Sequence, residues 1–326
     1  MRIGLWSDSV NFPSLPLMKI SAYHKSLNDS VSFVDEGGHY DKVYLSKVFN
    51  IPTLKKIPQS PPLFEADEVC KGGTGYAIDV INGIEIFDPK KHKDLPDIIE
   101  RQFPDYSLYP QYSEAYGFLT RGCCNNCSFC IVCPKEGRGS RQVADLSDFW
   151  NGQRVIRLMD PNLLACPQRE ALLTQLQQSG ARVDFTQGLD ARLVNEDVMR
   201  QISQIKVQSI HFAFDLMKNE QSILRGLRCF CNHWEGDFRR VYVYVLTNYN
   251  TSLQEDWYRV KTLRDMGMFP YIMIYQKGTH PRFLTDLARW CNNPRLYRSS
   301  TFEDYVPRVD GKSCRELYND ILKGVI

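Results

Sequence analysis

The sequence predicts an α/β protein built on parallel β-sheet, and two observations carry that prediction. Short apolar runs alternate with segments of helical periodicity over roughly residues 146–293. A weaker version of the same rhythm occupies the first hundred residues or so. Because parallel strands need long crossover connections, which are usually helices, this alternation favours parallel pairing. The larger sheet could be open or curled into a barrel.

The second block contains short runs rich in Val, Ile, Phe and Tyr, which are typical of strands. These runs are Tyr116–Thr120, Val155–Asp160, Val183–Gln187, Ser209–Asp215, Val241–Asn248 and Pro270–Gln276. Between them, Glu170–Gly180 has helical spacing and ends on a glycine, and Asn195 opens another helix as a capping residue. Together these segments predict about six strand–helix units.

The first block predicts a smaller α/β layer, which we expect to be Rossmann-like. It contains three strand-like runs and one helix-like run, namely Met1–Trp6, Val31–Val34, Lys42–Val48 and Leu17–Leu27. The segment Glu68–Lys71 leads into a glycine-rich turn, Gly72–Gly75, and Phe103–Tyr112 is interpreted as a linker. We therefore predict three parts: residues 1–108, residues 109–285 and a helical extension at 286–326, whose aromatic residues would cover the larger sheet.

The bulk properties are those of an ordinary globular chain. Its 40 basic and 38 acidic residues leave a formal net charge of +2, which gives no electrostatic footprint for nucleic acid. No run of about 18 apolar residues suggests a membrane span. The opening residues MRIGLWSDSV have no signal-peptide pattern, so we expect a cytoplasmic protein without a membrane partner.

Five of the 11 cysteines crowd into residues 123–133, which favours a metal centre over disulfides. Thiolates are the ligands that iron–sulfur clusters prefer. One register takes Cys123, Cys127 and Cys130 as ligands. A second takes Cys124 with Cys127 and Cys130 and approaches a ferredoxin run, but Cys133 comes one residue too early. A zinc knuckle is the third interpretation, and it lacks a second ligand pair at the usual spacing.

The first register, with Phe129 just before its last cysteine, resembles the radical S-adenosylmethionine (SAM) superfamily. The segment GFLTRGCCNNCSFCIV is similar to the cluster loop of members that follow an N-terminal cobalamin-binding-type domain. Three further segments resemble strand ends of that group: Leu158–Asn162, Asp190–Leu193 and Phe212–Asp215, the last with Asp where the family usually has Glu. The resemblance covers most of residues 114–276, and it implies a (βα)6 partial barrel.

The resemblance also implies a chemistry. Cys123, Cys127 and Cys130 would hold a [4Fe–4S] cluster with one iron open to SAM, which is cleaved reductively to a 5′-deoxyadenosyl radical. An external flavodoxin or ferredoxin would supply the electron. Further SAM-binding candidates are Phe129, Asp160, Asn162, Asp190, Arg192 and Asp215. Each of the three aspartates could equally cap a helix or a turn, and Arg192 could form an exposed ion pair. Cys124 and Cys133 are expected to be inert neighbours, with a catalytic role or an extra ligand as the alternative.

Cobalamin is a weaker expectation. Some relatives carry Asp-x-His-x-x-Gly after the first strand, whereas Ser7–Asn11 here lacks both the histidine and the glycine. The first part would then serve packing or substrate recognition. None of the 6 histidines shows ligand spacing, so they are treated as structural or surface groups. The leading hypothesis is a radical SAM enzyme of unidentified substrate. The alternatives are a tRNA- or nucleobase-modifying radical SAM enzyme and a non-enzymatic iron–sulfur or zinc protein.

Overall fold

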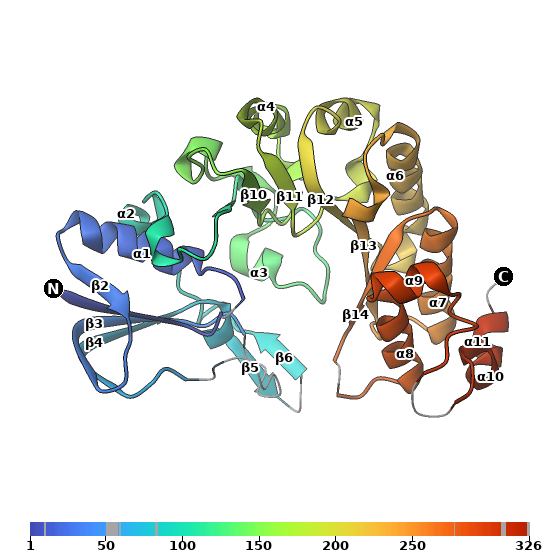
Figure 1. Ribbon diagram of the computed structural model, residues 1–326, viewed down its shortest axis with the longest axis horizontal. Helices are drawn as coiled ribbons and strands as arrows, with labels where there is room; N and C mark the ends of the chain where they lie inside the picture. The colour runs from blue at the N-terminus through green and yellow to red at the C-terminus, as the bar shows by residue number, and fades with distance from the viewer. Residues whose placement is uncertain are drawn as a thin grey trace.

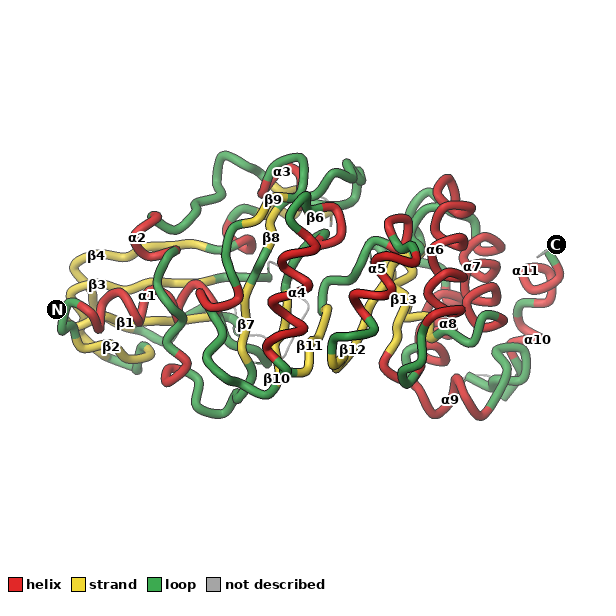
Figure 2. Tube along the Cα trace, turned by 90° about the horizontal axis from the view of Figure 1, so that it is seen from above, coloured by secondary structure: helices red, strands yellow, loops and turns green. Residues whose placement is uncertain are grey.

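The computed structural model describes residues 1–9, 11–49, 58, 60–81, 84–276, 278–307 and 311–324. It is a mixed α/β chain with a four-stranded and a six-stranded sheet, both entirely parallel, which confirms the predicted class. Figures 1 and 2 show the four-stranded sheet at the N-terminal end and the helices of the tail at the other. None of the helices in these ranges is both long and apolar enough to cross a lipid bilayer.

The N-terminal sheet has the strand order β2-β1-β3-β4. Its strands are β1 (Arg2–Ser7), β2 (Ser30–Phe33), β3 (Gly38–Ser46) and β4 (Phe64–Gly72). Helix α1 (Leu15–Ser26) packs on it through Leu17 and Ile20, which share a small core with Ile3 and Leu5. A hairpin of β5 (Ile78–Ile81) and β6 (Ile84–Phe87) and a short helix α2 (Asp97–Glu100) follow. The predicted strands and helix of this region are therefore present.

The predicted linker is more ordered than its composition suggested. Asp105 caps a short 3-10 turn at Tyr106–Leu108, and its carboxylate accepts hydrogen bonds from Ser21 and Lys25 of α1, each at 2.6 Å. The Tyr106 hydroxyl donates to the carbonyl of Phe149 at 2.5 Å. The segment thus fastens the first helix to the structure around the larger sheet.

The six-stranded sheet has the order β14-β13-β12-β11-β10-β7. Among these six strands, each one therefore pairs with the strand that comes before or after it along the chain. The strands are β7 (Ala115–Gly117), β10 (Val155–Leu158), β11 (Arg182–Phe185), β12 (Lys206–Ala213), β13 (Val241–Thr247) and β14 (Phe269–Ile274). The helices after β10 to β14 are α4 (Arg169–Ser179), α5 (Glu196–Ile202), α6 (Glu220–His233), α7 (Leu253–Asp265) and α8 (Arg282–Cys291). This series matches the predicted runs closely.

One face of this sheet forms the main core. Alternate residues such as Ile156, Val183, Ile210 and Val243 are fully buried among residues of the helices. Because side chains alternate along a strand, the residues between them lie on the opposite face, which we call the inner face. In Figure 1 the strands fan in an arc with α4, α5 and α6 on its outer side. Polar side chains can therefore lie on the inner face without entering the main core.

The tail packs into the same core. Helices α9 (Pro294–Ser299), α10 (Cys314–Leu317) and α11 (Asn319–Lys323) follow α8. Trp290 and Phe302 are completely buried. Tyr318 packs edge-on against Phe283 and stacks on Phe302. The aromatic residues of the tail are thus part of the hydrophobic core of the larger sheet.

The predicted strand Tyr116–Thr120 is interrupted. Strand β7 ends at Gly117, and Thr120–Arg121 forms a separate short strand, β8, which pairs with β9 (Arg141–Gln142). The reason is Asp160, whose carboxylate accepts the backbone N–H groups of Leu119 and Thr120 at 3.2 and 2.5 Å. Those donors are therefore lost to the sheet, and the chain turns toward the cysteines.

Candidate functional site

Four of the five clustered cysteines lie on a loop, Gly122–Ile131, between β8 and helix α3 (Val132–Glu136), and Cys133 lies in α3. We call this loop the cysteine loop. Figure 1 shows α3 on the inner side of the arc of strands. Gly122 has a φ of +83°, and a Cβ there would lie 2.4 Å from the carbonyl oxygen of Gly139, so only glycine fits. The N–H of Gly139 donates to the carbonyl of Cys123 at 3.1 Å, which closes the base of the loop.

Asp160 supports this loop from the end of β10. It is 4% exposed and accepts three hydrogen bonds, from the N–H groups of Leu119 and Thr120 and from the Thr120 hydroxyl at 2.7 Å. Burial raises the pKa of Asp160 to about 6, against the opposing effect of these donors. Asp160 does not line the pocket described below. Its contacts give it a positioning role, in agreement with the turn-forming alternative.

The three candidate ligands differ in exposure. Cys123 is buried, whereas Cys127 and Cys130 are partly exposed. The Sγ of Cys123 is approached by the N–H of Asn125 at 3.4 Å and by the side-chain amide of Asn162 at 3.5 Å. Burial raises the pKa of both Cys127 and Cys130, and the Cys123 thiol adds to this effect. The thiol of Cys123 is therefore close enough to affect the other two electrostatically, and hydrogen-bond donors for its thiolate are already in place.

The other two cysteines have different surroundings. Cys133 donates from its Sγ to the carbonyls of Cys123 and Asn125, both at 3.2 Å, so it braces the cysteine loop from α3. Cys124 is exposed, and its thiol contacts Asn125 Oδ1 at 3.6 Å. The side-chain amide of Asn162 also approaches the Sγ of Cys124, at 3.9 Å. That both cysteines are inert neighbours stays a prediction.

The donor set fits an iron–sulfur cluster by its chemistry, because three cysteines from one tight loop can supply soft anionic sulfur. The loop as described is not closed around a metal. No group of three or more His, Cys, Asp or Glu side chains among the described residues is arranged to hold a metal ion.

Asp190 is the hub of a polar cluster beside the loop. Its carboxylate accepts from Arg192 through Nε at 2.8 Å and Nη2 at 2.7 Å, from Asn125 at 2.8 Å and from Asn162 at 3.2 Å. Although burial raises the pKa of Asp190, donation from Arg192 and Asn125 outweighs burial and holds it below its usual value. The carboxylate is therefore ionised and fixed, and the turn after β11 is tied to the loop.

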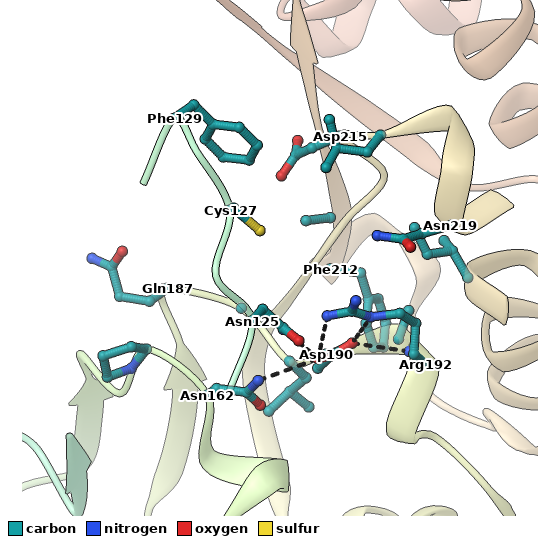
Figure 3. Close-up of a pocket in the computed structure, with 17 residues that line it drawn as sticks. Asn125, Cys127, Phe129, Asn162, Gln187, Asp190, Arg192, Phe212, Asp215 and Asn219 are labelled. Atoms are coloured by element: carbon teal, nitrogen blue, oxygen red, sulfur yellow. Dashed lines mark hydrogen bonds and ion pairs between the residues drawn. The ribbon is translucent and has the colours of Figure 1, made fainter. Parts of the chain in front are cut away.

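These groups surround one pocket (Figure 3). Its walls include the candidates Cys127, Phe129, Asn162, Asp190, Arg192 and Asp215. Five of the six additional SAM-binding candidates thus meet at one place, and only Asp160 lies outside it. The Oδ1 atom of Asn162 is buried on this wall without a hydrogen-bond partner in the described chain. Such an orphaned acceptor is costly unless a ligand supplies a donor.

Asp215 closes the pocket from β12. It accepts a hydrogen bond from the N–H of Leu246 at 2.9 Å, and burial raises its pKa. The guanidinium of Arg259, on α7, is fully buried and donates to the carbonyls of Phe214 and Asp215 at 2.7 and 2.9 Å. The end of β12 is therefore rigidly held from α7.

Phe129 has partners that the sequence reasoning missed. Its ring meets Tyr249 edge-on with centroids 5.2 Å apart, and the Tyr249 hydroxyl is 2.6 Å from the hydroxyl of Ser128. Tyr249 in turn packs edge-on against Tyr275 at 4.9 Å. The only available signal was that both tyrosines directly follow strands β13 and β14, where parallel folds place ligand-binding groups.

The N-terminal glycine turn is structural. Gly73 has a φ of +98°, and a Cβ there would lie 2.4 Å from the carbonyl oxygen of Lys47. The turn therefore packs against the chain's own backbone. In the stretch Ser7–Asn11, Val10 lies outside the described residues, and Asp8 is buried, accepting from the N–H groups of Val48 and Phe49 at 2.8 and 2.9 Å. These contacts leave the expectation of cobalamin without support.

No protein-family model matches this chain, and no curated protein shows significant similarity to it.

Proposed function

We propose that this protein is a radical SAM enzyme that binds a [4Fe–4S] cluster at Cys123, Cys127 and Cys130. The observation that carries the proposal is the meeting of the cysteine loop with strand-end polar groups around one pocket. The series of parallel strand–helix units is consistent with a (βα)6 partial barrel preceded by a Rossmann-like domain. In parallel α/β folds the ligand site lies at the carboxyl ends of the strands, which is where this pocket lies.

A bound cluster would supply the electron that cleaves SAM to methionine and a 5′-deoxyadenosyl radical. The chain's own residues would bind and orient SAM. Asn162 offers its unpartnered Oδ1 to the ammonium. Arg192 donates to Asp190 through Nε and Nη2, so its Nη1 is the group that it offers to the carboxylate. Phe129 provides a ring face for the adenine, with its edge-on contact to Tyr249 fixing its orientation. Asp215 provides an acceptor for a ribose hydroxyl.

The proposal is tested by anaerobic reconstitution with iron and sulfide, followed by dithionite and SAM. We expect 5′-deoxyadenosine and methionine in equal amounts, measured by liquid chromatography and mass spectrometry. A Cys130→Ala variant should lose both the cluster absorbance and the products. Cys229→Ala, on α6 and away from the cysteine loop, is the matched control and should retain both.

Two outcomes would contradict the proposal. An intact cluster that yields no 5′-deoxyadenosine would indicate an electron-transfer protein. Binding of one zinc ion in place of iron and sulfide would indicate a structural metal site.

A further inference from the structure

A second group of side chains lies on the inner face of the six-stranded sheet, adjoining the pocket. It comprises Tyr116, Arg157, Asp184, Ser209, His211, Tyr242, Tyr244 and Tyr271. On β12, Ala213 lines the pocket and lies two residues beyond His211 on the same face. A molecule on the inner face would therefore lie directly next to whatever occupies the pocket.

The contacts of His211 hold its ring in one orientation and leave one ring nitrogen, Nε2, without a hydrogen bond. Its ring stacks between Tyr242 and Tyr244, with centroids 5.4 and 5.1 Å away and interplanar angles of 16° and 9°. Its Nδ1 is 3.0 Å from the carbonyl oxygen of Phe185, which can only accept, so Nδ1 carries the proton. Burial lowers the pKa of His211, although Asp184 lies 4.0 Å from Nδ1. The neutral ring thus presents the lone pair of Nε2, which has no partner among the described residues.

On this face one arginine lies between two carboxylates. Arg157 donates to Asp184 at 2.8 Å and to Glu114 at 3.3 Å, and Asp184 also accepts from Ser209 at 2.6 Å. The phenols of Tyr116 and Tyr244 are neutral, because burial raises the pKa of each to about 12. Around Arg157 the carboxylates outnumber the cation, so a phosphate or a carboxylate of a ligand would be repelled there.

An aromatic ring remains open beside this group. Tyr271 of β14 is 42% exposed and touches Tyr244 only edge-on, with centroids 5.9 Å apart at 83°. Met273, two residues further along the same strand, is 37% exposed. Exposed apolar surface on β14 therefore borders Tyr244, which in turn stacks on His211.

We propose that the inner face binds the substrate through an uncharged aromatic or heteroaromatic ring that carries an N–H or O–H donor. His211 Nε2 accepts that hydrogen bond, and the ring packs against Tyr271. Calling this ring the substrate rests on the function proposed above, but its binding does not require a cluster or SAM.

The test uses the purified full chain and three probes that differ in one property each. Indole is neutral and has an N–H donor, 1-methylindole lacks the donor, and indole-3-acetate adds a negative charge. Dissociation constants are measured by ligand-detected NMR. We expect indole to bind about tenfold more tightly than either of the others, because one hydrogen bond or one unpaired buried charge is worth at least that much.

Two variants separate the contributions. His211→Phe keeps a ring between Tyr242 and Tyr244 but removes Nε2, so indole and 1-methylindole should then bind equally. Tyr271→Ala should weaken both about threefold to tenfold without changing their ratio. His39→Phe, at an exposed histidine of β3, is the control and should leave all three constants unchanged.

Equal binding of the three probes to the unaltered chain would overturn the inference, as would discrimination that persists in His211→Phe. The absence of indole binding at millimolar concentration, with the chain folded by circular dichroism, would also overturn it. These results are independent of SAM cleavage, so a failure of the proposed function and a failure of this inference can be told apart.

Discussion

At the scale of single residues, the site depends on side chains with several simultaneous partners. Asp190 joins Arg192, Asn125 and Asn162, and Asn162 in turn reaches the Sγ of Cys123. A carboxylate with charged and amide donors holds them in one arrangement more firmly than isolated pairs do. Asp190 is therefore one of the contacts that orient the cysteine loop toward the pocket.

The choice between the two cysteine registers can be tested at this scale. Cys123 is buried with donors at 3.4 and 3.5 Å from its sulfur, whereas Cys124 is exposed and has the Asn162 amide at 3.9 Å. After anaerobic reconstitution, Cys123→Ala should retain less than about a tenth of the iron and sulfide, and Cys124→Ala should retain nearly all of it. Iron and sulfide analysis with the visible absorbance spectrum measures this. Loss of the cluster in Cys124→Ala alone would establish the ferredoxin-like register instead.

Elements are held to one another by a few buried contacts near the site. Helix α6 approaches the turn Ala191–Leu193 so closely that a Cβ on Gly226 would lie 1.7 Å from the carbonyl oxygen of Ala191. Helix α7 is joined to the ends of β12 and β13 by Arg259, which is 0% exposed. Both contacts lie directly behind residues that line the pocket.

The contact between α6 and the turn predicts the effect of Gly226→Ala. The added methyl group has to push the helix and the turn apart, which should lower the free energy of unfolding by about 2 kcal/mol. Because the turn carries Arg192 and follows Asp190, SAM affinity should fall as well. Urea unfolding and calorimetric titration measure the two effects. Gly72→Ala, where a Cβ would meet nothing within 4 Å, is the control, and equal effects of the two substitutions would contradict the prediction.

The contacts of Arg259 predict a larger loss of stability on its replacement than that expected for Gly226→Ala. Besides its ion pair with Asp256, it donates to the carbonyls of Phe214, Asp215 and Leu246. Arg259→Met would leave these acceptors unpaired in the core, so we expect a loss of about 3–5 kcal/mol in the free energy of unfolding.

The control is Arg200→Met, because the Arg200 side chain is 73% exposed. It should change the free energy of unfolding by less than about 0.5 kcal/mol. A loss below about 1 kcal/mol in Arg259→Met, measured by urea unfolding, would show that the buried guanidinium does not support the strand ends.

At the scale of the whole molecule, the segment between the two sheets is a structural joint. Asp105 receives hydrogen bonds from Ser21, Lys25 and Ser107, and Phe33 of β2 meets Tyr109 edge-on at 5.4 Å. Burial raises the pKa of Asp105, but its donors, led by Lys25, outweigh burial and hold the pKa below its usual value. The joint should therefore be sensitive to acid.

The sign of this sensitivity follows from the lowered pKa. The stabilisation by Asp105 is fully present above the pKa of an unfolded aspartate, about 3.9, and is lost as the pH falls through the lower folded value. Asp105→Asn should therefore unfold about 1 kcal/mol more easily at pH 7, with the difference shrinking toward pH 3. Urea unfolding at both pH values measures this. Asp197→Asn, at an exposed residue, is the control, and a difference that grew in acid would contradict the assignment.

The sequence predicted the elements of this molecule better than it predicted its contacts. Periodicity located the strands from Val155 to Ile274, because the alternation of buried residues is a local property. Asn195 was likewise identified as a cap, and its side chain accepts from the N–H of Val198. Of the nine candidate site residues, six line the pocket, since residues at strand ends of a parallel sheet converge whatever their exact role.

What the sequence could not provide were contacts between distant positions. Asp160 was expected at the cofactor, but it supports Leu119 and Thr120, which lie about forty positions earlier in the chain. Nothing local distinguishes a carboxylate that faces a ligand from one that accepts backbone N–H groups. Tyr249 and His211 were missed for the same reason, because their stacking partners are set by the pairing of strands.

The supports of the cysteine loop have a consequence for how the protein is made. The loop is braced by Asp160, Asp190 and Tyr249, all of which are synthesised after it. On the ribosome, the nascent cysteines emerge before any of these partners exist. If the proposed cluster is bound, its insertion should therefore follow translation of β13. A truncated chain that ends before β13 would carry the same thiols without the contacts that hold the loop.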